Sequence, residues 1–551
     1  MKPIIYQLLP RLFSNANANL VENGSIQENG VGKFEGINDA ALSSIKRLGA
    51  THVWFTGIIR HATQTDYSTF GLDAYDSKVV KGKAGSPYAI TDYYDVDPDL
   101  AVNVPNRMDE FCALVRRTHS HDLKALIDFV PNHVGRQYHS VVKPDGIRDL
   151  GEDDRTDYFF EKDNNFYYLQ GQSLTLPYGN GGYCESPAKV TGNDCFSSTP
   201  SVNDWYETIK LNYGVDCSNW TRHFDPIPST WHKMLDILLF WCQKGIDGFR
   251  CDMAHMVPVE FWHWAIGEVK VKYPNVIFIA ELYDVGLYRS YIEYGGFDYL
   301  YDKVNLYDTL CGVAKGQQSV SNLTGCWQRI DGINSQMLNF LENHDEMRLA
   351  SSMFLKNPQL ALPAFVASLT MSKAPFMLYF GQELGEKGDC AEGFSGHDGK
   401  TTIFDYWSLD TVRRWYDNGK CDGRLLSKSE IALRNYYEWI LNLTNNTKAL
   451  CDGDFFDLMY VNNKNLNFCF NYAYLRHSNK ETVLIVLNFG DHVADLNVCI
   501  PQHAFSMFGL PAGEQKAVDL QTGESFSIML QPDECVKVTV APHNATLIKI
   551  C

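Results

Sequence analysis

An arginine and an aspartate stand two positions apart in GIDGFRCDMAHM, residues 245–256, directly after an apolar stretch with helical periodicity. Side chains alternate along a β-strand, so Arg250 and Asp252 are expected on the same side of the strand FRCD. Two charges at the end of a buried strand are costly unless they are paired. An ion pair with Arg250 would keep the carboxylate of Asp252 ionised, as a catalytic nucleophile requires.

The next apolar run, VIFIAE, also ends in a carboxylate, Glu281. Helical patterns on both sides of FRCD put Asp252 and Glu281 at the carboxyl ends of parallel strands, which lie about 4.8 Å apart. The two carboxylates would then be about 5 Å apart, the separation of a retaining glycosidase. The apolar neighbours of Glu281 should raise its pKa, which suits a general acid that later acts as base. A structural ion pair and a helix-capping glutamate remain the alternative for this pair alone.

Two further strand ends carry similar side chains. Asp128 and His133 lie in KALIDFVPNH, and His344 and Asp345 lie in MLNFLENHDEMR. Carboxylates, imidazoles and an arginine on four strand ends are hard to explain by fold stability alone, and they favour a shared catalytic site.

Apolar runs alternate with amphipathic helical patterns from about residue 4 to residue 440. The runs are IIYQLLP, THVWFTG, KALIDFV, DGFRCD, NVIFIAE, QMLNFLEN and PFMLYFG. Such alternation indicates parallel strands joined by crossover helices. Seven or eight units over about 400 residues predict an α/β fold, a (β/α)8 TIM barrel, whose chemistry lies at the carboxyl ends of its strands.

Two segments interrupt this alternation. Residues 135–215 are rich in Gly, Asn, Tyr and Ser and show no long periodic helix, so we expect a loop-rich domain inserted after the third strand. From about residue 449 the helical patterns stop, and turn-separated runs such as ETVLIVLNFG predict a C-terminal antiparallel β-sandwich. The expected domains are a barrel of residues 1–134 and 216–448, an inserted domain B of residues 135–215, and a β domain of residues 449–551.

Composition limits the kinds of partner. The formal net charge is −18 and no basic block occurs, which argues against nucleic acid or an anionic membrane surface. The N-terminus has no features of a secretory signal, and no apolar run reaches the roughly 20 residues that span a bilayer. The 15 cysteines show no regular spacing, so we expect reduced, buried thiols in a cytoplasmic protein.

The segments DFVPNH, GFRCD, FIAE and FLENHD resemble, in order and spacing, the four short conserved regions of the α-amylase family of glycoside hydrolases. The resemblance covers essentially the whole chain. It implies that Asp252 is the catalytic nucleophile, Glu281 the general acid/base and Asp345 the transition-state stabiliser. Arg250 would orient Asp252.

The resemblance also implies a set of residues around the bound sugar. His133 and His344 would hydrogen-bond the sugar ring at the cleaved bond, and Asp128 would support this cluster. In the loop GSPYAITDYYDVDP, Tyr88 would stack on that sugar and Asp92 would help to hold the loop.

The sequence departs from the family's calcium-binding pattern. Secreted members usually carry Lys-His three and four residues after the nucleophile, where this chain has His255 and Met256, although Asn132 matches a side-chain ligand. The family's other calcium loop falls at SNANANL, which offers asparagines in place of carboxylates. Because a hard cation prefers charged oxygens, the sequence does not favour bound calcium, and no cofactor is expected to be required.

The resemblance thus implies a retaining hydrolase of α-1,4 bonds in starch-like glucans or maltooligosaccharides, acting through a covalent glycosyl-aspartate intermediate. An exo-acting α-glucosidase or a glucan transglycosylase on the same site is the alternative. A metal-dependent hydrolase using His119 and His121 is disfavoured, because this pair precedes KALIDFV and so lies at the wrong end of the barrel. A non-catalytic binding module would typically lack the three carboxylates. The sequence leaves the oligomeric state open.

Overall fold

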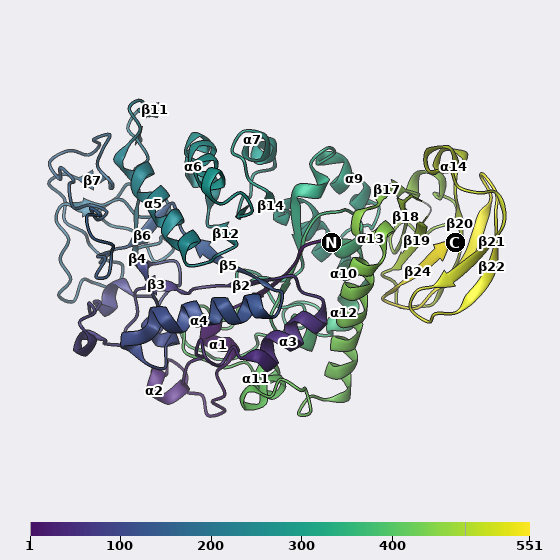
Figure 1. Ribbon diagram of the computed structural model, residues 1–551, viewed down its shortest axis with the longest axis horizontal. Helices are drawn as coiled ribbons and strands as arrows, with labels where there is room; N and C mark the ends of the chain where they lie inside the picture. Colours follow the sequence, from purple (N-terminus) through teal and green to yellow (C-terminus); the bar gives the residue numbers. More distant parts are fainter. Residues whose placement is uncertain (1, 480, 551) are drawn as a thin grey trace.

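The structure is a computed structural model that describes residues 2–479 and 481–550. Eight parallel strands close into a barrel in the order β1-β16-β15-β14-β13-β12-β5-β2, at the centre of the larger part of the molecule (Figure 1). Their bounds are β1 Ile4–Leu8, β2 His52–Phe55, β5 Lys124–Phe129, β12 Gly248–Cys251, β13 Ile277–Ala280, β14 Tyr299–Tyr301, β15 Met337–Phe340 and β16 Phe376–Tyr379. The predicted (β/α)8 barrel is therefore confirmed.

One barrel strand, β14, was not recognised in the sequence. It consists of three residues, YLY, yet it pairs with β13 on one side and β15 on the other. A strand is recognised by a pattern over four to eight residues, so three residues carry too little periodicity. Only the closure of the barrel identifies this segment as a strand.

Helices cover the outside of the barrel and bury their apolar stripes against it. The longer ones are α3 Asp39–Leu48, α4 Arg107–Ser120, α5 Ser229–Gln243, α6 Val259–Lys272, α9 Asn322–Arg329, α10 Leu362–Thr370 and α12 Lys428–Asn446. The start of α12 is set by a capping box between Ser427 and Glu430, which satisfies N–H groups that have no partner within the helix. Shorter helices, α7 Tyr288–Glu293 and α8 Asp308–Ala314, follow the later strands.

The segment between β5 and β12 contains short pairs of antiparallel strands. Its residues 135–215 contain no helix. The pairs are β6 (His133–Gly135) with β9 (Thr208–Lys210), β7 (Tyr168–Leu169) with β8 (Ala188–Lys189), and β10 (Val215–Asp216) with β11 (Thr221–Arg222). A small apolar cluster that includes Tyr167, Leu174 and Val190 holds the segment together. It lies at the end of the barrel away from the C-terminus (Figure 1).

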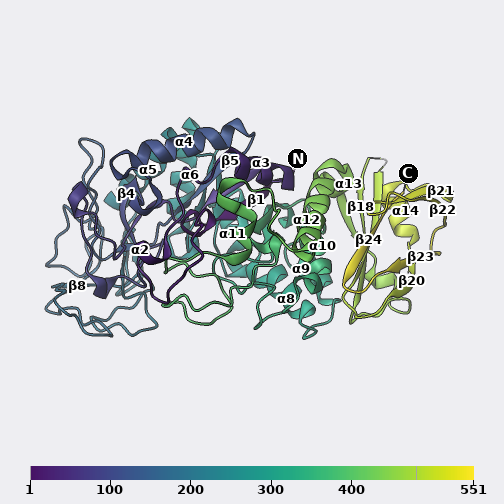
Figure 2. The same cartoon turned by 90° about the horizontal axis from the view of Figure 1, so that it is seen from below.

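The C-terminal part contains a six-stranded antiparallel sheet and a two-stranded sheet, β20–β23. The strands are β17 Asp454–Asp457, β18 Asn471–Ser478, β19 Glu481–Asn488, β20 Ala494–Cys499, β21 Gly513–Asp519, β22 Ser525–Leu530, β23 Cys535–Val540 and β24 Asn544–Ile550. Both views show this part packed beyond α10 and α12 (Figures 1 and 2). The expectation that helices stop near residue 449 was wrong, because α13 (Lys448–Asp452) and α14 (Gln502–Phe508) lie in this region. Each has at most seven residues, too few to show helical periodicity.

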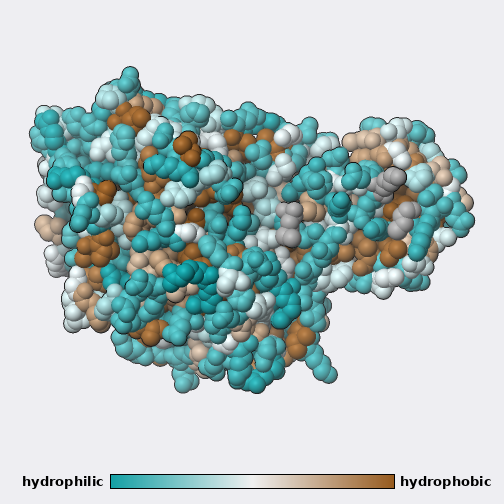
Figure 3. Space-filling view, in the orientation of Figure 1, coloured by the Kyte–Doolittle hydropathy of each residue, from teal (hydrophilic) through white to brown (hydrophobic). Residues whose placement is uncertain are grey.

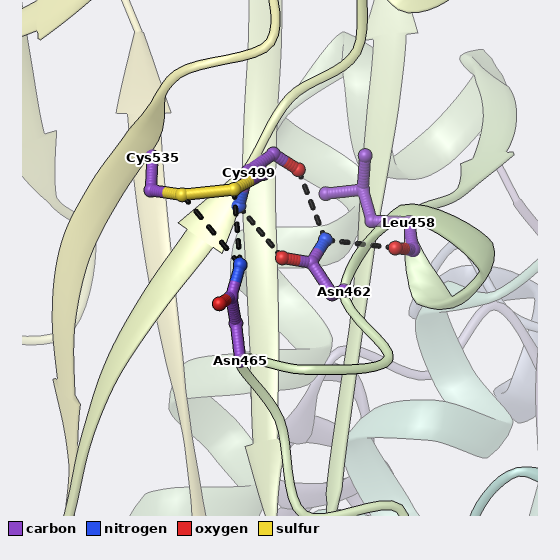
Figure 4. Close-up of a disulfide and its surroundings, with 5 residues drawn as sticks. All are labelled: Leu458, Asn462, Asn465, Cys499 and Cys535. Carbon is purple, nitrogen blue, oxygen red and sulfur yellow. Dashed lines mark hydrogen bonds between the residues drawn. A yellow bond between two sulfur atoms is a disulfide. The ribbon is translucent and has the colours of Figure 1, made fainter.

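Two cysteines of the C-terminal part form a disulfide. Cys499 in β20 lies directly opposite Cys535 in β23, and the side-chain amide of Asn465 lies against both sulfur atoms (Figure 4). The expectation of reduced, buried cysteines was therefore wrong for this pair, and Cys184 and Cys469 are exposed. Strand register brings together residues 36 positions apart, which cysteine spacing alone does not reveal.

The visible surface is mostly hydrophilic, with scattered apolar patches (Figure 3). Among the described residues, none of the helices combines the length and apolarity that crossing a bilayer requires.

Candidate active site

The carboxylates of Asp252 and Glu281 directly follow paired residues of two neighbouring strands. Cys251 in β12 pairs with Ala280 in β13, and the N–H of Glu281 donates to the carbonyl of Cys251 over 3.0 Å. Asp252 and Glu281 are the next residues of the two strands. The strand register therefore puts both side chains at the carboxyl end of the barrel, as parallel strands require.

Arg250 lies beneath these carboxylates and is 1% exposed. Its Nη1 lies 2.7 Å from Oδ1 of Asp252 and 3.4 Å from Oδ1 of Asp128, and its Nη2 lies 2.8 Å from Oε1 of Glu281. One guanidinium thus joins three buried carboxylates. Its positive charge offsets part of the cost of burying them, which explains why Arg250 and Asp252 occur side by side.

Three aromatic rings enclose the guanidinium. Its carbon lies 5.4 Å from the ring centre of Trp54, 5.3 Å from that of Tyr88 and 5.6 Å from that of Tyr301. Nε of Arg250 also donates to the hydroxyl of Tyr301 over 3.3 Å. These cation–π contacts hold the arginine in a fixed orientation. Tyr301 belongs to β14, the strand that the sequence did not reveal.

Glu281 accepts two hydrogen bonds, in addition to its ion pair with Arg250. The N–H of Met253 donates to Oε2 over 2.8 Å, and the hydroxyl of Tyr283 donates to Oε1 over 2.6 Å. Met253 has a φ of 42°, a left-handed conformation that is unusual for a non-glycine residue. Burial raises the pKa of Glu281, and the negative charge of Asp252 raises it further, while Arg250 acts in the opposite direction.

Asp345 enters the same space from the end of β15. Its Oδ2 lies 3.0 Å from Nε2 of His344, whose Nδ1 contacts the side-chain amide of Gln7 at 2.8 Å. Desolvation in the pocket and the negative charge of Glu281 raise the pKa of Asp345. Burial lowers the pKa of His344, and Arg250 lowers it further, so this imidazole is neutral and acts as a hydrogen-bonding group.

Tyr88, Asp128 and His133 lie around this cluster. The ring of Tyr88 stacks on that of His344 at 5.3 Å, and Asp128 accepts from Nε1 of Trp54 over 3.0 Å. Burial raises the pKa of Asp128 to about 7, against the lowering effect of Arg250. Burial also lowers the pKa of His133 to about 3.

A cavity of about 340 Å³ opens between these residues. The residues named from the sequence that line it are Tyr88, His133, Asp252, Glu281, His344 and Asp345. Arg250 and Asp128 lie behind the carboxylates. Asp92 is fully buried away from the cavity, and its Oδ2 accepts the N–H of Val141 over 2.8 Å. The structure thus places Asp92 where it holds the start of the inserted segment and not in contact with the cavity.

The sequence missed several cavity residues on loops. The ring of Trp205 lies 5.1 Å from that of His133, and Lys81 and Glu207 form an ion pair of 2.9 Å. These positions lie in segments without periodicity, so no pattern marked them. Tyr283 could have been found, because it lies two residues after Glu281.

The residues around the family's calcium position do not fit a bound calcium ion. Oδ1 of Asn132 accepts from Nζ of Lys210 over 2.9 Å, and the same Nζ lies 2.5 Å from Oδ1 of Asp194. A buried ammonium group between these oxygens opposes a second cation there. In SNANANL, the amide of Asn15 donates to main-chain carbonyls of the protein.

Elsewhere in the described chain, no group of three or more His, Cys, Asp or Glu side chains could hold a metal ion. His119 pairs with Asp247 and His121 with Asp39, each at 2.8 Å, at the end of α4. Both histidines lie just before the start of β5, at the opposite end of that strand from Phe129, as ion-pairing groups at a helix terminus.

Comparisons with known proteins agree with this geometry. A family model described as "Alpha amylase, catalytic domain" matches residues 7–423. A cyclomaltodextrinase of Geobacillus thermopakistaniensis is 23% identical over 533 residues, which are 94% of this chain and 74% of the relative. An α-1,4-glucan:maltose-1-phosphate maltosyltransferase of Cereibacter sphaeroides is 46% identical over 57 residues, only 10% of each protein.

Solved structures share the fold at low identity. An α-amylase of Geobacillus thermoleovorans in complex with acarbose superposes with a TM-score of 0.66 at 19% identity, over 100% of this chain and 98% of the other. A maltogenic α-amylase of Thermotoga neapolitana gives a TM-score of 0.64 at 18% identity, over 99% and 98%. Because the family model spans most of the sequence, the chain belongs to the α-amylase family of glycoside hydrolases.

Proposed function

We propose that the protein is a retaining glycoside hydrolase that cleaves α-1,4-glucosidic bonds in starch-like glucans or maltooligosaccharides. The observation that carries this proposal is that Asp252 and Glu281 follow paired positions of adjacent parallel strands and share one guanidinium. Adjacent strands are about 4.8 Å apart. This suits the separation of roughly 5–5.5 Å in retaining enzymes better than the 6.5–9.5 Å that an inverting enzyme needs for its water.

In the first step, Glu281 in its acid form donates a proton to the glycosidic oxygen while the carboxylate of Asp252 attacks the anomeric carbon. The bond between that carbon and the oxygen breaks, and the leaving chain departs with a new hydroxyl group. Burial raises the pKa of Glu281, which favours the protonated form that this step requires. Asp345 would hold the sugar hydroxyls and stabilise the positive charge that develops on the ring.

In the second step, Glu281 in its base form takes a proton from water, and the resulting hydroxide equivalent attacks the anomeric carbon. The bond to Asp252 breaks, the sugar leaves with its original anomeric configuration, and Glu281 is again protonated. If a sugar hydroxyl replaces water, the same intermediate yields a transfer product. A glucan transglycosylase or an exo-acting α-glucosidase therefore remains the alternative.

Names of relatives support an α-glucan as substrate, since they include a cyclomaltodextrinase and an amylase solved with acarbose. The test is to incubate the protein with maltoheptaose and follow the anomeric protons of the products by NMR. We expect the α-anomer to appear first, and early release of the β-anomer would refute retention. Mid-length fragments indicate endo action, whereas glucose alone indicates exo action.

Asp252→Asn should abolish turnover without changing the unfolding transition, because the amide cannot act as nucleophile. Undiminished turnover by this variant would show that Asp252 is not the nucleophile. As a matched control, Asp284→Asn changes an exposed carboxylate near the site and should keep full activity.

A further inference from the structure

One wall of the catalytic cavity is formed by three segments of chain that lie outside the eight barrel strands. The segment after β2 contributes Lys81, the segment after β16 contributes Phe404, and the inserted segment contributes Glu207. In the closed barrel, β13 is four strands away from β1 in either direction, and β2 and β16 are the neighbours of β1. The segments after β2 and β16 therefore lie across the barrel mouth from Glu281, which directly follows β13.

Direct contacts join the three segments. The N–H of Ala84 donates to the carbonyl of Phe404 over 3.0 Å. A Cβ atom on Gly82 would lie only 2.2 Å from the same carbonyl oxygen, so no space remains between these two segments. Nζ of Lys81 lies 2.9 Å from Oε2 of Glu207, which joins the first segment to the inserted one. The wall is therefore continuous from Phe404 to Glu207.

A buried arginine holds this wall from behind. Nη1 of Arg11, in α1 (Pro10–Phe13), donates to the carbonyls of Gly85 over 3.0 Å and Ile403 over 2.9 Å. Its Nη2 donates to the carbonyl of Ala84 over 2.9 Å. Moving either segment away would leave a buried charge without these partners, which is costly. The wall is thus a fixed part of the barrel mouth.

Lys81 and Glu207 are a nearly buried ion pair at the surface of the cavity. Their side chains are 12% and 5% exposed, so protein and not solvent lies behind them. Nζ of Lys81 also lies 5.0 Å from the ring centre of Tyr206. Oε2 of Glu207 accepts no hydrogen bond of normal geometry from the part of the chain that the structure describes. A hydroxyl group of a ligand in the cavity would supply the missing donor.

The wall lies on the side of the sugar that stays on the enzyme. Glu281 protonates the departing oxygen, so the sugar retained on Asp252 extends away from Glu281 and toward the wall. An α-1,4-glucan continues from that sugar through oxygen 4, toward its non-reducing end. A carboxylate such as Glu207 can only accept hydrogen bonds. Oxygen 4 carries a proton to donate in the terminal sugar and none in a sugar within the chain.

We propose that the Lys81–Glu207 pair closes the cavity on this side and binds hydroxyl groups of the terminal sugar, so that the protein removes short sugars from the non-reducing end of an α-glucan. The inference rests on the proposed retaining mechanism and selects exo action for it. Lys81 donates to these hydroxyl groups, and Glu207 accepts from them. A chain that continued beyond the terminal position would collide with the wall.

A substrate with a blocked end tests the wall. An ethylidene bridge between oxygens 4 and 6 of the non-reducing terminal sugar of maltoheptaose removes both hydroxyl groups and adds bulk. The wild type should have a kcat/KM about a hundredfold lower for the blocked than for the unmodified substrate. Lys81→Ala, which shortens the wall, should raise the ratio of blocked to unmodified kcat/KM about tenfold, and Glu207→Gln should lower kcat/KM for unmodified maltoheptaose about tenfold. Equal wild-type values for the two substrates, or an unchanged ratio in Lys81→Ala, would overturn the proposal.

Lys143→Ala is the matched control. Lys143 also forms an ion pair within the inserted segment, with Glu152 at 3.2 Å, and its loss should keep the wild-type ratio. If the wild type turns over neither substrate, the proposed function fails. The wall is then tested by calorimetric titration with maltose and with maltose that carries the same ethylidene bridge. Tighter binding of unmodified maltose that is weakened in Glu207→Gln supports the proposal, and equal or absent binding overturns it.

Discussion

Replacing Arg250 by methionine should destabilise the protein to an extent that depends on pH. The guanidinium lies 2.7 Å from Asp252, 2.8 Å from Glu281 and 3.4 Å from Asp128, and methionine supplies none of its charge. Removing one partner of a buried ion pair typically costs about 3–5 kcal/mol. Because the three carboxylates share one arginine, we expect a loss of about 4 kcal/mol in the free energy of unfolding at pH 8.

The sign of the pH dependence follows from the carboxyl pKa values. Burial raises the pKa of Asp128 to about 7 and raises the pKa values of Asp252 and Glu281, although Arg250 lowers all three. Without Arg250 these values should rise further. A carboxyl whose pKa is higher in the folded than in the unfolded state costs stability when ionised, and this cost disappears as the pH falls below the folded pKa. At pH 5 the loss in the free energy of unfolding should therefore be only about 1–2 kcal/mol. This remainder comes from the hydrogen bonds that methionine cannot make.

Urea unfolding of the wild type and of Arg250→Met at pH 5, 6.5 and 8 measures this difference. Arg148→Met is the matched control. The side chain of Arg148 is 59% exposed and pairs with Glu152 and Asp153, so its loss should change the free energy of unfolding by less than about 1 kcal/mol at each pH. Equal losses for Arg250→Met at pH 5 and pH 8 would refute the charge-based reasoning.

Two further predictions concern the pKa of Glu281 and the family's calcium position at Asn132. Tyr283→Phe removes a donor that lowers the pKa of Glu281, so the alkaline limb of the kcat/KM profile should move up by about one pH unit. Tyr288→Phe should leave that limb in place, since this hydroxyl has no hydrogen-bond partner within residues 2–479 and 481–550. A limb that stays or moves down in Tyr283→Phe would contradict the role of that hydrogen bond. Lys210 holds a positive charge at the family's calcium position, so the urea unfolding curve of the wild type should be the same with EDTA and with calcium. Lys210→Met should lower the free energy of unfolding by about 1–3 kcal/mol, because Asn132 and Asp194 lose their partner. Calcium-dependent unfolding of the wild type would contradict this assignment.

Elements with long, regular patterns were predictable, and short ones were not. Strands such as β5 and β12 carry enough apolar residues to be recognised, and they place Asp128 and Asp252 at strand ends. The strand β14 and the helices α13 and α14 have too few residues for periodicity to appear. The disulfide of Cys499 depends on the register of two strands, which no local pattern encodes.

The order of strand and helix, and the position of each carboxylate at a strand end, follow from the sequence alone, because periodicity and alternation are local properties of the chain. Which side chains then meet was decided only by tertiary structure. Barrel closure brings Trp54 and Tyr301 around Arg250, and the fold of the inserted segment brings Lys210 to Asn132. Such contacts join residues far apart in the sequence, so they depend on strand register and loop paths, which are fixed when the whole core packs.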